Sequence, residues 1–346
     1  MTNTDHMSED DLTALRNRLM AKAFMTDGVE QIEEAILRRH RQLLYVNDPT
    51  QPWKGENRAW VRALVVGAKF RTGKTRAVRE ALKRLKDISL PDGKVLPAFA
   101  ISVTAPEHFT MEALGRAILN EMKLMPARSI GTTATIERLH TRIALKRPTI
   151  IHIDEAQRML KPDRVAQHRR LEEQVKIFGQ LRALIDLKAW PVILVLSGTP
   201  ELIRALEHEE FGFFRELADF VAIAPLSIGN PDHQGDLEDA LVAAVEKADM
   251  TVDLEGCNDF YDRLMLAANF AWGFAFDICH EAILLAAEDG RKSVTVEDFA
   301  AFYARKAGCF RAANPFVAEE WQVIDPRVLL AKMTGDMASR VWDAER

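Results

Sequence analysis

The sequence predicts an α/β fold, in which helices cover both faces of a parallel sheet, followed by a smaller helical region. Between residues 63 and 196, short apolar runs of strand length alternate with stretches of helical periodicity. These runs are apolar at nearly every position, which is typical of parallel strands buried on both faces. From about residue 230 onward, the pattern indicates helices only.

The composition is that of an ordinary globular protein. The chain has 346 residues, 48% of them hydrophobic, and its 46 basic and 51 acidic side chains give a net charge of −5. This charge excludes a uniformly basic nucleic-acid coat protein, but it is compatible with a local basic patch. The three cysteines form no C-x-x-C pair, and no apolar run approaches the ~20 residues that cross a bilayer. We therefore expect a cytoplasmic protein with reduced cysteines and no membrane partner.

The first 55 residues are expected to form a helical extension and a linker. Residues 1–11 are polar and expected to be disordered, and helical periodicity follows at 12–24 and 29–45. The prolines and the glycine within residues 47–55 indicate a linker into the first core strand.

The core of the predicted fold covers residues 56–228. Its strands are expected at 63–66, 98–103, 149–153 and 191–196, and its helices at 74–86, 111–122, 135–145 and 169–187. Alternation of strands and helices implies a parallel sheet with helices on both faces.

Residues 229–310 are expected to form a helical subdomain. Its helices are predicted at 237–247, 259–268, 274–288 and 296–306. Residues 295–298 read Thr-Val-Glu-Asp, which resembles a helix start with acidic residues in the first turn. The tail, residues 311–346, receives no fold assignment.

The loop after the first strand has a phosphate-binding pattern, because a strand, a loop ending in Gly-Lys-Thr and a helix follow one another. The candidate nucleotide-binding residues of this loop are Gly67, Ala68, Lys69, Phe70, Arg71, Thr72, Gly73, Lys74 and Thr75. Backbone N–H groups at a helix N-terminus surround phosphate oxygens, Lys74 would reach the β- and γ-phosphates, and the Thr75 hydroxyl would bind Mg²⁺. The usual pattern has glycine where this chain has Ala68. We therefore expect either a negative φ at Ala68 or a re-registered loop.

Two adjacent carboxylates, Asp154 and Glu155, follow the apolar strand at 149–153. In a P-loop sheet, the aspartate helps to hold nucleotide and Mg²⁺, and the glutamate orients and deprotonates the attacking water. An isolated Asp-Glu pair could equally be a solvated turn, but the phosphate loop upstream favours the nucleotide site. We find no N-K-x-D segment that would read guanine, so ATP is the expected nucleotide.

The next strand ends in Ser197-Gly198-Thr199-Pro200. A polar side chain here can sense the γ-phosphate or the attacking water, and Thr199 and Ser197 are the candidates. The alternative is a simple strand-ending turn. We interpret His152, inside the acidic strand, as a core residue rather than a ligand.

Basic residues cluster in two regions that could contact DNA phosphates. The preferred candidates, which follow the acidic pair, are Arg158, Lys161, Arg164, Arg169 and Arg170. The other cluster, on the helix after the phosphate loop, comprises Arg76, Arg79, Lys83, Arg84 and Lys86. Either cluster could instead be a solvated face.

The three strand ends together resemble the AAA+ ATPases of the TniB/TnsC family, to which the bacteriophage Mu B protein is functionally related. The resemblance is carried by Gly-Lys-Thr at 73–75, Asp-Glu-Ala-Gln at 154–157 and Gly-Thr-Pro-Glu-Leu at 198–202. Residues 282–295 are similar to the lid helix of this family and the turn after it, and 314–316 to a segment near the end of TniB-type chains. ATPases of the secretion-accessory ExeA type share the second and third motifs.

The resemblance implies an AAA+ ATPase with a C-terminal helical lid, which uses ATP and Mg²⁺ and regulates DNA transposition. It implies head-to-tail assembly on double-stranded DNA as a hexamer-like ring or filament, and recruitment and activation of a DDE-type transposase. It also implies an arginine finger acting in trans, for which Arg215 is the nearest candidate and Arg204 the second. The sensor arginine of the lid is missing after Gly273, where residues 274–277 read Phe-Ala-Phe-Asp, so hydrolysis is expected to be slow. An ATP-binding scaffold with little turnover and an ExeA-like secretion-accessory ATPase remain open as alternatives.

Overall fold

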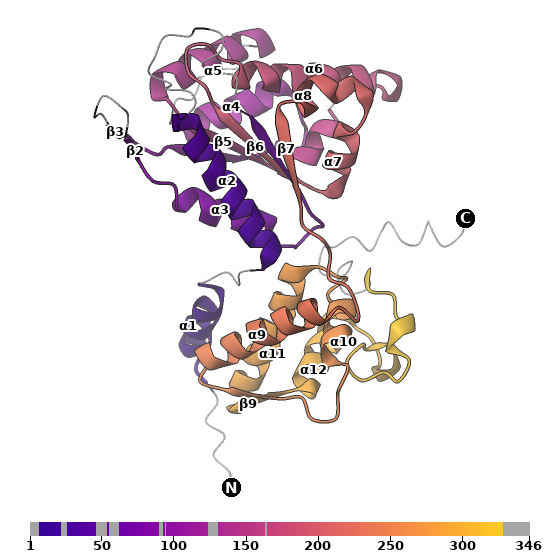
Figure 1. Ribbon diagram of the computed structural model, residues 1–346. Coiled ribbons are helices and arrows are strands. Elements are labelled where there is room, and N and C mark those ends of the chain that lie inside the picture. The colour runs from indigo at the N-terminus through magenta and orange to yellow at the C-terminus, as the bar shows by residue number, and fades with distance from the viewer. Residues whose placement is uncertain are drawn as a thin grey trace. The chain divides into compact units, whose positions relative to one another are not determined.

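The computed structural model describes residues 7–21, 26–45, 54, 62–89, 93, 95–123, 131–162 and 165–327. These residues form two compact units (Figure 1). The sheet unit comprises the described residues from 27 to 224 except 70–73. The helical unit comprises those before 27, residues 70–73 and those after 224.

The sheet unit is built on five parallel strands. They are β1 (Ala63–Gly67), β4 (Ala100–Thr104), β5 (Ile150–Asp154), β6 (Ile193–Gly198) and β7 (Ala218–Ala222), in the order β4-β5-β6-β1-β7. Every residue of β1, β5 and β6 is buried, which accounts for their apolar sequences. The register pairs Gly67 with Gly198, and Thr104 with Asp154. Because parallel strands end at the same edge of a sheet, the three predicted motifs meet at this edge.

Helices cover both faces of the sheet. α2 (Asp27–Tyr45) packs against α3 (Lys74–Lys83) and against the central strands. After β4, the chain returns across the sheet through β5 and β6 to β7. Right-handed crossovers therefore place the helices of this return path on the face opposite α3 (Figure 1). These helices are α4 (Met111–Glu121), α5 (Thr132–Lys146), α6 (Arg170–Ile185), α7 (Pro200–Leu206) and α8 (Gly212–Arg215).

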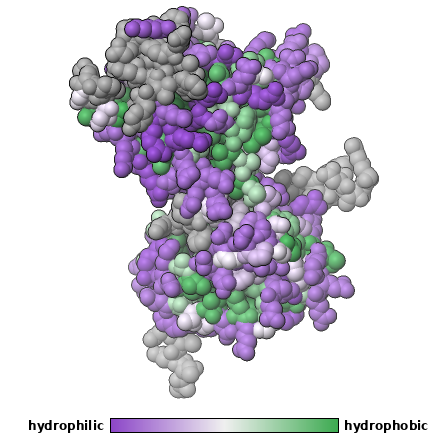
Figure 2. Space-filling view, in the orientation of Figure 1, coloured by the Kyte–Doolittle hydropathy of each residue, from purple (hydrophilic) through white to green (hydrophobic). Residues whose placement is uncertain are grey.

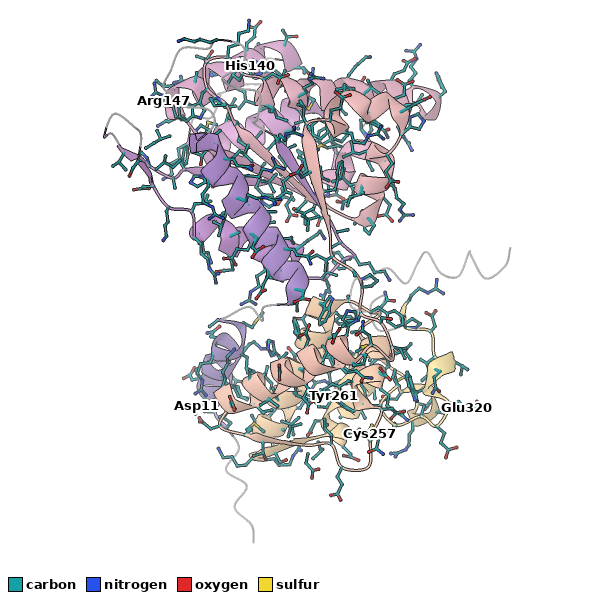
Figure 3. All side chains as sticks on the ribbon, viewed as in Figure 1. Asp11, His140, Arg147, Cys257, Tyr261 and Glu320 are labelled. Carbon is teal, nitrogen blue, oxygen red and sulfur yellow. The ribbon has the colours of Figure 1, made fainter. Side chains whose placement is uncertain are left out.

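Short elements connect the main ones in the sheet unit. They are the hairpin β2 (Ile88–Ser89) with β3 (Val95–Leu96), and the 3₁₀ turns η2 (Ala156–Leu160), η3 (Gln167–Arg169) and η4 (Glu209–Phe211). Arg147, labelled in Figure 3, stops α5 in the left-handed conformation with φ 56°. Its guanidinium lies 5.3 Å from the centre of the Trp190 ring, so the end of α5 is anchored just before β5 begins.

The helical unit consists of five helices and a short parallel strand pair in the described residues. They are α1 (Glu9–Met20), α9 (Pro231–Lys247), α10 (Phe260–Ala267), α11 (Trp272–Glu288) and α12 (Val296–Ala307), with β8 (Thr251–Asp253) beside β9 (Ser293–Thr295). Thr295 and Asp298 form a capping box at the start of α12, where the sequence predicted a helix start. The rings of Phe260, Phe299 and Phe316 pack together at its centre.

Part of the C-terminal tail packs against the helical unit. It contains η5 (Arg311–Ala313) and η6 (Trp321–Val323). The Trp321 indole N–H donates to the Asp259 carboxylate at 2.7 Å, and the Arg263 guanidinium donates to two backbone carbonyls of the tail, at Pro315 and Ala318. These contacts hold the tail segment in place.

The surface of both units is largely hydrophilic in the view of Figure 2. No single helix of the described part is long and apolar enough to cross a membrane. Only α10 and α11 together pass that test of length and composition, and they are bent by 111° at their junction. Cys257, Cys279 and Cys309 are all free thiols.

Candidate nucleotide site

The phosphate loop begins where β1 ends, and packing dictates its first residues. A Cβ on Gly67 would overlap the side chain of Ile203 on α7, with the Cγ1 atom only 2.8 Å away, so this position needs glycine. Ala68 is buried, its φ is not positive, and its backbone N–H donates to the Gly198 carbonyl at 3.1 Å. Because φ at Ala68 is not positive, the loop accepts alanine in place of the usual glycine. This is the first of the two arrangements that the sequence predicted.

The tip of the loop turns sharply before α3. Arg71 and Gly73 have positive φ, 59° and 89°. A Cβ on Gly73 would meet no atom within 4 Å, which leaves open space in front of the N-terminus of α3. The first turn of α3 contains no acidic side chain, and Lys74 at its start is only 4% exposed. A positive helix end with a buried lysine and no acidic residue in its own first turn fits the phosphates of a nucleotide.

Thr75 and Asp154 meet beside the loop. The Thr75 hydroxyl donates to Oδ2 of Asp154 at 2.8 Å. A hydroxyl and a carboxylate are the hard oxygen donors that Mg²⁺ prefers, so the donor set fits this ion. The sequence predicted both residues as its ligands.

A chain of hydrogen bonds extends from Asp154 into the sheet. The Ser197 hydroxyl donates to Oδ1 of Asp154 at 2.6 Å. Nε2 of His152 lies 2.8 Å from Oγ of Ser197, and Nδ1 lies 2.8 Å from Oγ of Ser102. Since Ser197 uses its proton on Asp154, the proton of neutral His152 belongs on Nε2, and Ser102 donates to Nδ1. Every hydrogen bond in this series therefore donates toward Asp154, from Ser102 through His152 and Ser197.

The surroundings of this hydrogen-bond series also determine the charge states of His152 and Asp154. Burial lowers the pKa of His152 to about 4, opposed by the attraction of Asp154, so the imidazole is neutral at pH 7. Burial on its own would raise the pKa of the Asp154 carboxyl, but hydrogen bonds from Ser197 and Thr75 outweigh it and hold that pKa below its ordinary value. Asp154 is therefore an anion next to the lysine-bearing loop.

Glu155 follows in a left-handed conformation, with φ 55°. Its backbone N–H donates to Oδ1 of Asp154 at 3.0 Å. Its carboxylate accepts a hydrogen bond from the Gln157 amide at 2.8 Å, and the same amide accepts one from the Thr199 backbone N–H at 3.2 Å. The structure thus brings the predicted residues Glu155 and Thr199 together through Gln157.

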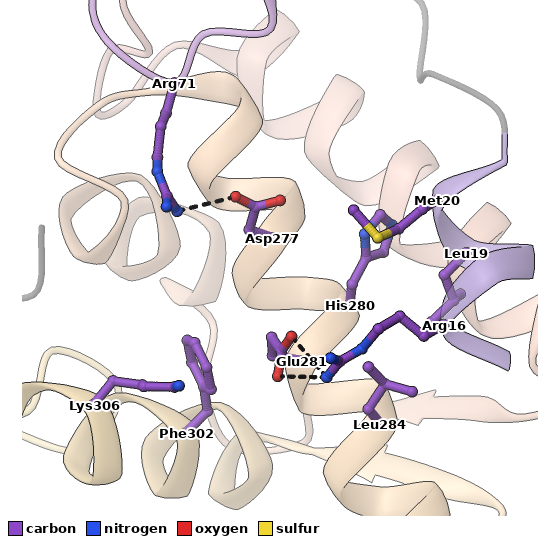
Figure 4. A pocket seen from close by; sticks show the side chains of 10 residues that line it. All are labelled: Arg16, Leu19, Met20, Arg71, Asp277, His280, Glu281, Leu284, Phe302 and Lys306. Atoms are coloured by element: carbon purple, nitrogen blue, oxygen red, sulfur yellow. Dashed lines mark hydrogen bonds and ion pairs between the residues drawn. The ribbon is translucent and has the colours of Figure 1, made fainter. Parts of the chain in front are cut away.

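Within the helical unit, the tip of the loop contacts the start of α11. The Arg71 guanidinium pairs with Asp277 at 3.2 Å (Figure 4). It also lies 5.3 Å from the centre of the Phe274 ring. A Cβ on Gly273 would lie 2.5 Å from the Arg71 carbonyl oxygen, which explains the glycine there. Residues 274–277, where the lid arginine is missing, are therefore contacted by Arg71 of the phosphate loop.

Arg215, the predicted finger, is exposed at the end of α8, and its guanidinium donates to the Glu207 carbonyl at 2.8 Å. β7 begins three residues later and pairs in parallel with β1, Ala218 opposite Ala63. Arg215 thus lies at the edge where β1 starts, about 16 Å of strand from the phosphate loop. Arg204, the second candidate, is exposed and pairs with Glu201 on its own helix.

The structure separates the predicted DNA-binding residues into different environments. Lys161 and Arg169 are exposed, whereas Arg158 is half-buried and donates to the Ala105 carbonyl at 2.7 Å. Arg170 is half-buried, and its Nε has no hydrogen-bond partner among the described residues. Arg164 lies outside the described residues.

The alternative basic cluster on α3 is partly neutralised. Lys83 pairs with Glu80 at 2.7 Å, and Arg84 pairs with Glu33 of α2. These pairs reduce the charge that Lys83 and Arg84 offer to an external anion.

Comparisons with known proteins agree with this geometry. Residues 62–206 match the model of a protein family described as an AAA domain. No curated protein matches the chain.

The solved structures that are similar to the chain include two from Aeropyrum pernix and one from Pyrobaculum aerophilum. The ORC2 protein of Aeropyrum pernix, in ADPNP–ADP complexes, has a TM-score of 0.57 and 15% identity over 84% of this chain and 71% of that one. The ORC1 protein of the same organism, in complex with DNA, has a TM-score of 0.55 and 17% identity over 86% and 70%. Cdc6p from Pyrobaculum aerophilum has a TM-score of 0.53 and 14% identity over 84% and 70%.

These findings confirm the predicted P-loop AAA+ fold, and the AAA match over residues 62–206 supports a P-loop ATPase. Sequence reasoning missed two members of the site, Gln157 and Ser102, and interpreted His152 only as core. The signal that could have found them is strand register. His152 is two residues before Asp154 on the same strand, and β6 and β4 bring Ser197 and Ser102 to its two sides.

Proposed function

We propose that this chain hydrolyses ATP to control its own assembly on double-stranded DNA, and that this assembly regulates DNA transposition by recruiting and activating a DDE-type transposase. The observation that supports it most is the convergence of Lys74, Thr75, Asp154 and Glu155 at one sheet edge, together with an exposed arginine, Arg215, at the opposite edge.

The chemistry follows from the placement of each group. Lys74 and the N–H groups of α3 bind the phosphates, and Thr75 with Asp154 would hold Mg²⁺, which supplies positive charge against the phosphate oxygens when bound. Glu155 takes a proton from the attacking water, and Thr199 stands at the neighbouring strand end, where the γ-phosphate or that water would be sensed. Arg71 uses its guanidinium on Asp277 and Phe274, so its role at the nucleotide is limited to its backbone.

Self-assembly follows from the position of Arg215. An arginine that lies a strand's length from its own phosphate loop acts on the site of another copy, and head-to-tail repetition of that contact gives a ring or a filament. The similar ORC1 structure, which contains DNA, supports a DNA-binding role, and Lys161 and Arg169 are the exposed cations that would contact phosphates.

The transposition role rests on the motif resemblance. The pairing of Asp-Glu-Ala-Gln with Gly-Thr-Pro-Glu-Leu supports a TniB/TnsC-type regulator, although ExeA-type ATPases share it. The lid segment without an arginine favours a second candidate, a scaffold that binds ATP and assembles with little turnover.

The test is duplex DNA binding in the presence of a non-hydrolysable ATP analogue or ADP, read by fluorescence anisotropy and by electron microscopy. We expect ordered assemblies on DNA with the analogue and few with ADP. Lys74→Ala should abolish both nucleotide binding and assembly, and Lys83→Ala on the same helix should not. DNA binding that ignores nucleotide would contradict the proposal. The transposase is identified by testing whether the assembled form, but not the ADP form, stimulates strand transfer by a DDE-type enzyme.

A further inference from the structure

The amide of Gln157 joins two strand ends of the site. Gln157 lies on η2, two residues after Glu155. Its Nε2–H donates to Oε2 of Glu155 at 2.8 Å, and its Oε1 accepts the backbone N–H of Thr199 at 3.2 Å. Because one end of the amide donates and the other accepts, the two bonds define a single orientation of this side chain.

Gly198 provides the space for this amide. A Cβ at position 198 would lie 2.8 Å from Oε1 of Gln157 and 3.2 Å from its backbone nitrogen. The 2.8 Å approach to Oε1 is closer than real Cβ atoms come to other atoms, so a side chain at 198 would displace the amide. The glycine after β6 and the glutamine after β5 are therefore matched parts of one contact.

Glu155 needs such support because its backbone is unusual. A left-handed residue, with φ 55°, does not continue the strand, so the strand geometry alone does not direct its side chain. The backbone of Glu155 is held by Asp154, and Gln157 holds its carboxylate. A general base must be held within hydrogen-bond reach of the water that it deprotonates, and loss of orientation costs rate without loss of binding.

We propose that Gln157 is a positioning residue, which orients the Glu155 carboxylate and couples it to the strand end that carries Thr199. This inference rests on the proposed role of Glu155 as general base. Among the described residues, the Gln157 amide hydrogen-bonds to the Glu155 carboxylate and the Thr199 backbone, so it acts through Glu155 rather than on substrate. Any shift of the Gly198-Thr199 segment is then transmitted to the base.

The first test is steady-state ATPase kinetics of Gln157→Met, which keeps the length of the side chain and removes both hydrogen bonds. We expect kcat to fall by roughly 10–100-fold, a part of the 10²–10⁴-fold that a positioned base contributes. KM for ATP and the Kd for ADP should change less than twofold. The matched control is Gln234→Met, which removes the same type of bond, from an amide to the Asp262 carboxylate, in the helical unit and should leave kcat unchanged.

Two further variants separate positioning from folding. Gly198→Ala should lower kcat similarly, and the double variant Gly198→Ala/Gln157→Met should lose less than the sum of the two single losses, because both disturb one contact. A defect that merely reflects folding would give additive losses, and would overturn the inference.

Glu155→Gln distinguishes this inference from the proposed function. If Glu155→Gln hydrolyses ATP at the wild-type rate, the base is wrong and the proposed function fails with it. If Glu155→Gln is inactive while Gln157→Met turns over normally, only the positioning role of Gln157 is overturned.

Discussion

At the scale of single residues, the buried His152 shows how the sheet interior supports the chemistry at its edge. The imidazole is fully buried, and its two nitrogens each have a serine partner. Through Ser197 it fixes one oxygen of Asp154, while Thr75 fixes the other. The carboxylate is thus oriented before any nucleotide binds.

The neutral state of His152 makes stability depend on pH. In the unfolded chain the imidazole binds a proton near pH 6.5, whereas in the folded chain the pKa is about 4. Between these values the unfolded state binds more protons, so this residue lowers the stability as pH falls from 6.5 to 4. Chemical denaturation at pH 7 and pH 5 measures this effect. Between these two pH values, wild type should lose about 2 kcal/mol more unfolding free energy than His152→Gln does. Equal losses in the two proteins would mean that His152 is not held neutral.

Sequence reasoning recognised the residues whose chemistry is local. Gly73, Lys74 and Thr75 belong to a strand-loop-helix unit whose parts follow one another in the chain. A short sequence pattern is therefore enough to identify them as phosphate-binding residues. It did not recognise Gln157, because its partners Thr199 and Gly198 are about 40 residues away and only the sheet register brings them near. The failure is one of tertiary contact and not of residue chemistry.

At the scale of elements, the strands with apolar sequences and most of the longer helices were predictable, and β7, at one edge of the sheet, was not. β1, β5 and β6 are buried at every position, so they appear as apolar runs. β7 is an edge strand whose exposure alternates, and it contains Asp219, which pairs with Arg39 of α2. A five-residue strand with a charge at its second position has no apolar run to reveal it. The strands of the hairpin β2-β3 and of the pair β8-β9 are too short to form an apolar run that a sequence pattern could reveal.

The packing of α7 against β1 gives a prediction about the first loop residue. Gly67→Ala would drive a Cβ into Ile203, so we expect a loss of about 1–3 kcal/mol of unfolding free energy and weaker ATP binding. Truncation of the obstructing side chain in Gly67→Ala/Ile203→Ala should restore nucleotide affinity, measured with a fluorescent ATP analogue. If the single variant is as stable as wild type, the close approach of α7 is not what requires glycine at this position.

At the scale of the whole molecule, the position of Arg215 predicts that the active site is completed by a second copy. Arg215→Ala should reduce ATP turnover by about 10³-fold or more while nucleotide affinity stays nearly unchanged. Mixing Arg215→Ala with Glu155→Gln should restore part of the activity, because one variant supplies the base and the other the arginine. Arg204→Ala is the matched control. If that variant loses turnover and Arg215→Ala does not, the finger is Arg204.

The exposed cations after β5 predict a phosphate-directed interaction with DNA. Lys161→Ala/Arg169→Ala should weaken binding to unrelated duplexes equally and make the log–log salt slope shallower by about 2, near 0.9 for each lost contact. Fluorescence anisotropy at several salt concentrations measures the slope. Lys83→Ala, which removes a cation already paired with Glu80, is the control and should leave it unchanged. A slope that responds only to the control would place the DNA surface on α3.

We expect ATP hydrolysis at Glu155 to end the DNA-bound state, and the lifetime of that state reports on this role of hydrolysis. The measurement is the dissociation rate of wild type and Glu155→Gln from duplex DNA after both are loaded with ATP and challenged with competitor DNA. Because Glu155→Gln binds ATP but lacks the base, its assemblies should outlast those of wild type by at least tenfold, and wild type should match it when loaded with a non-hydrolysable analogue. Equal lifetimes for the two proteins in ATP, with ATP turnover abolished in the variant, would show that hydrolysis does not control the DNA-bound assembly.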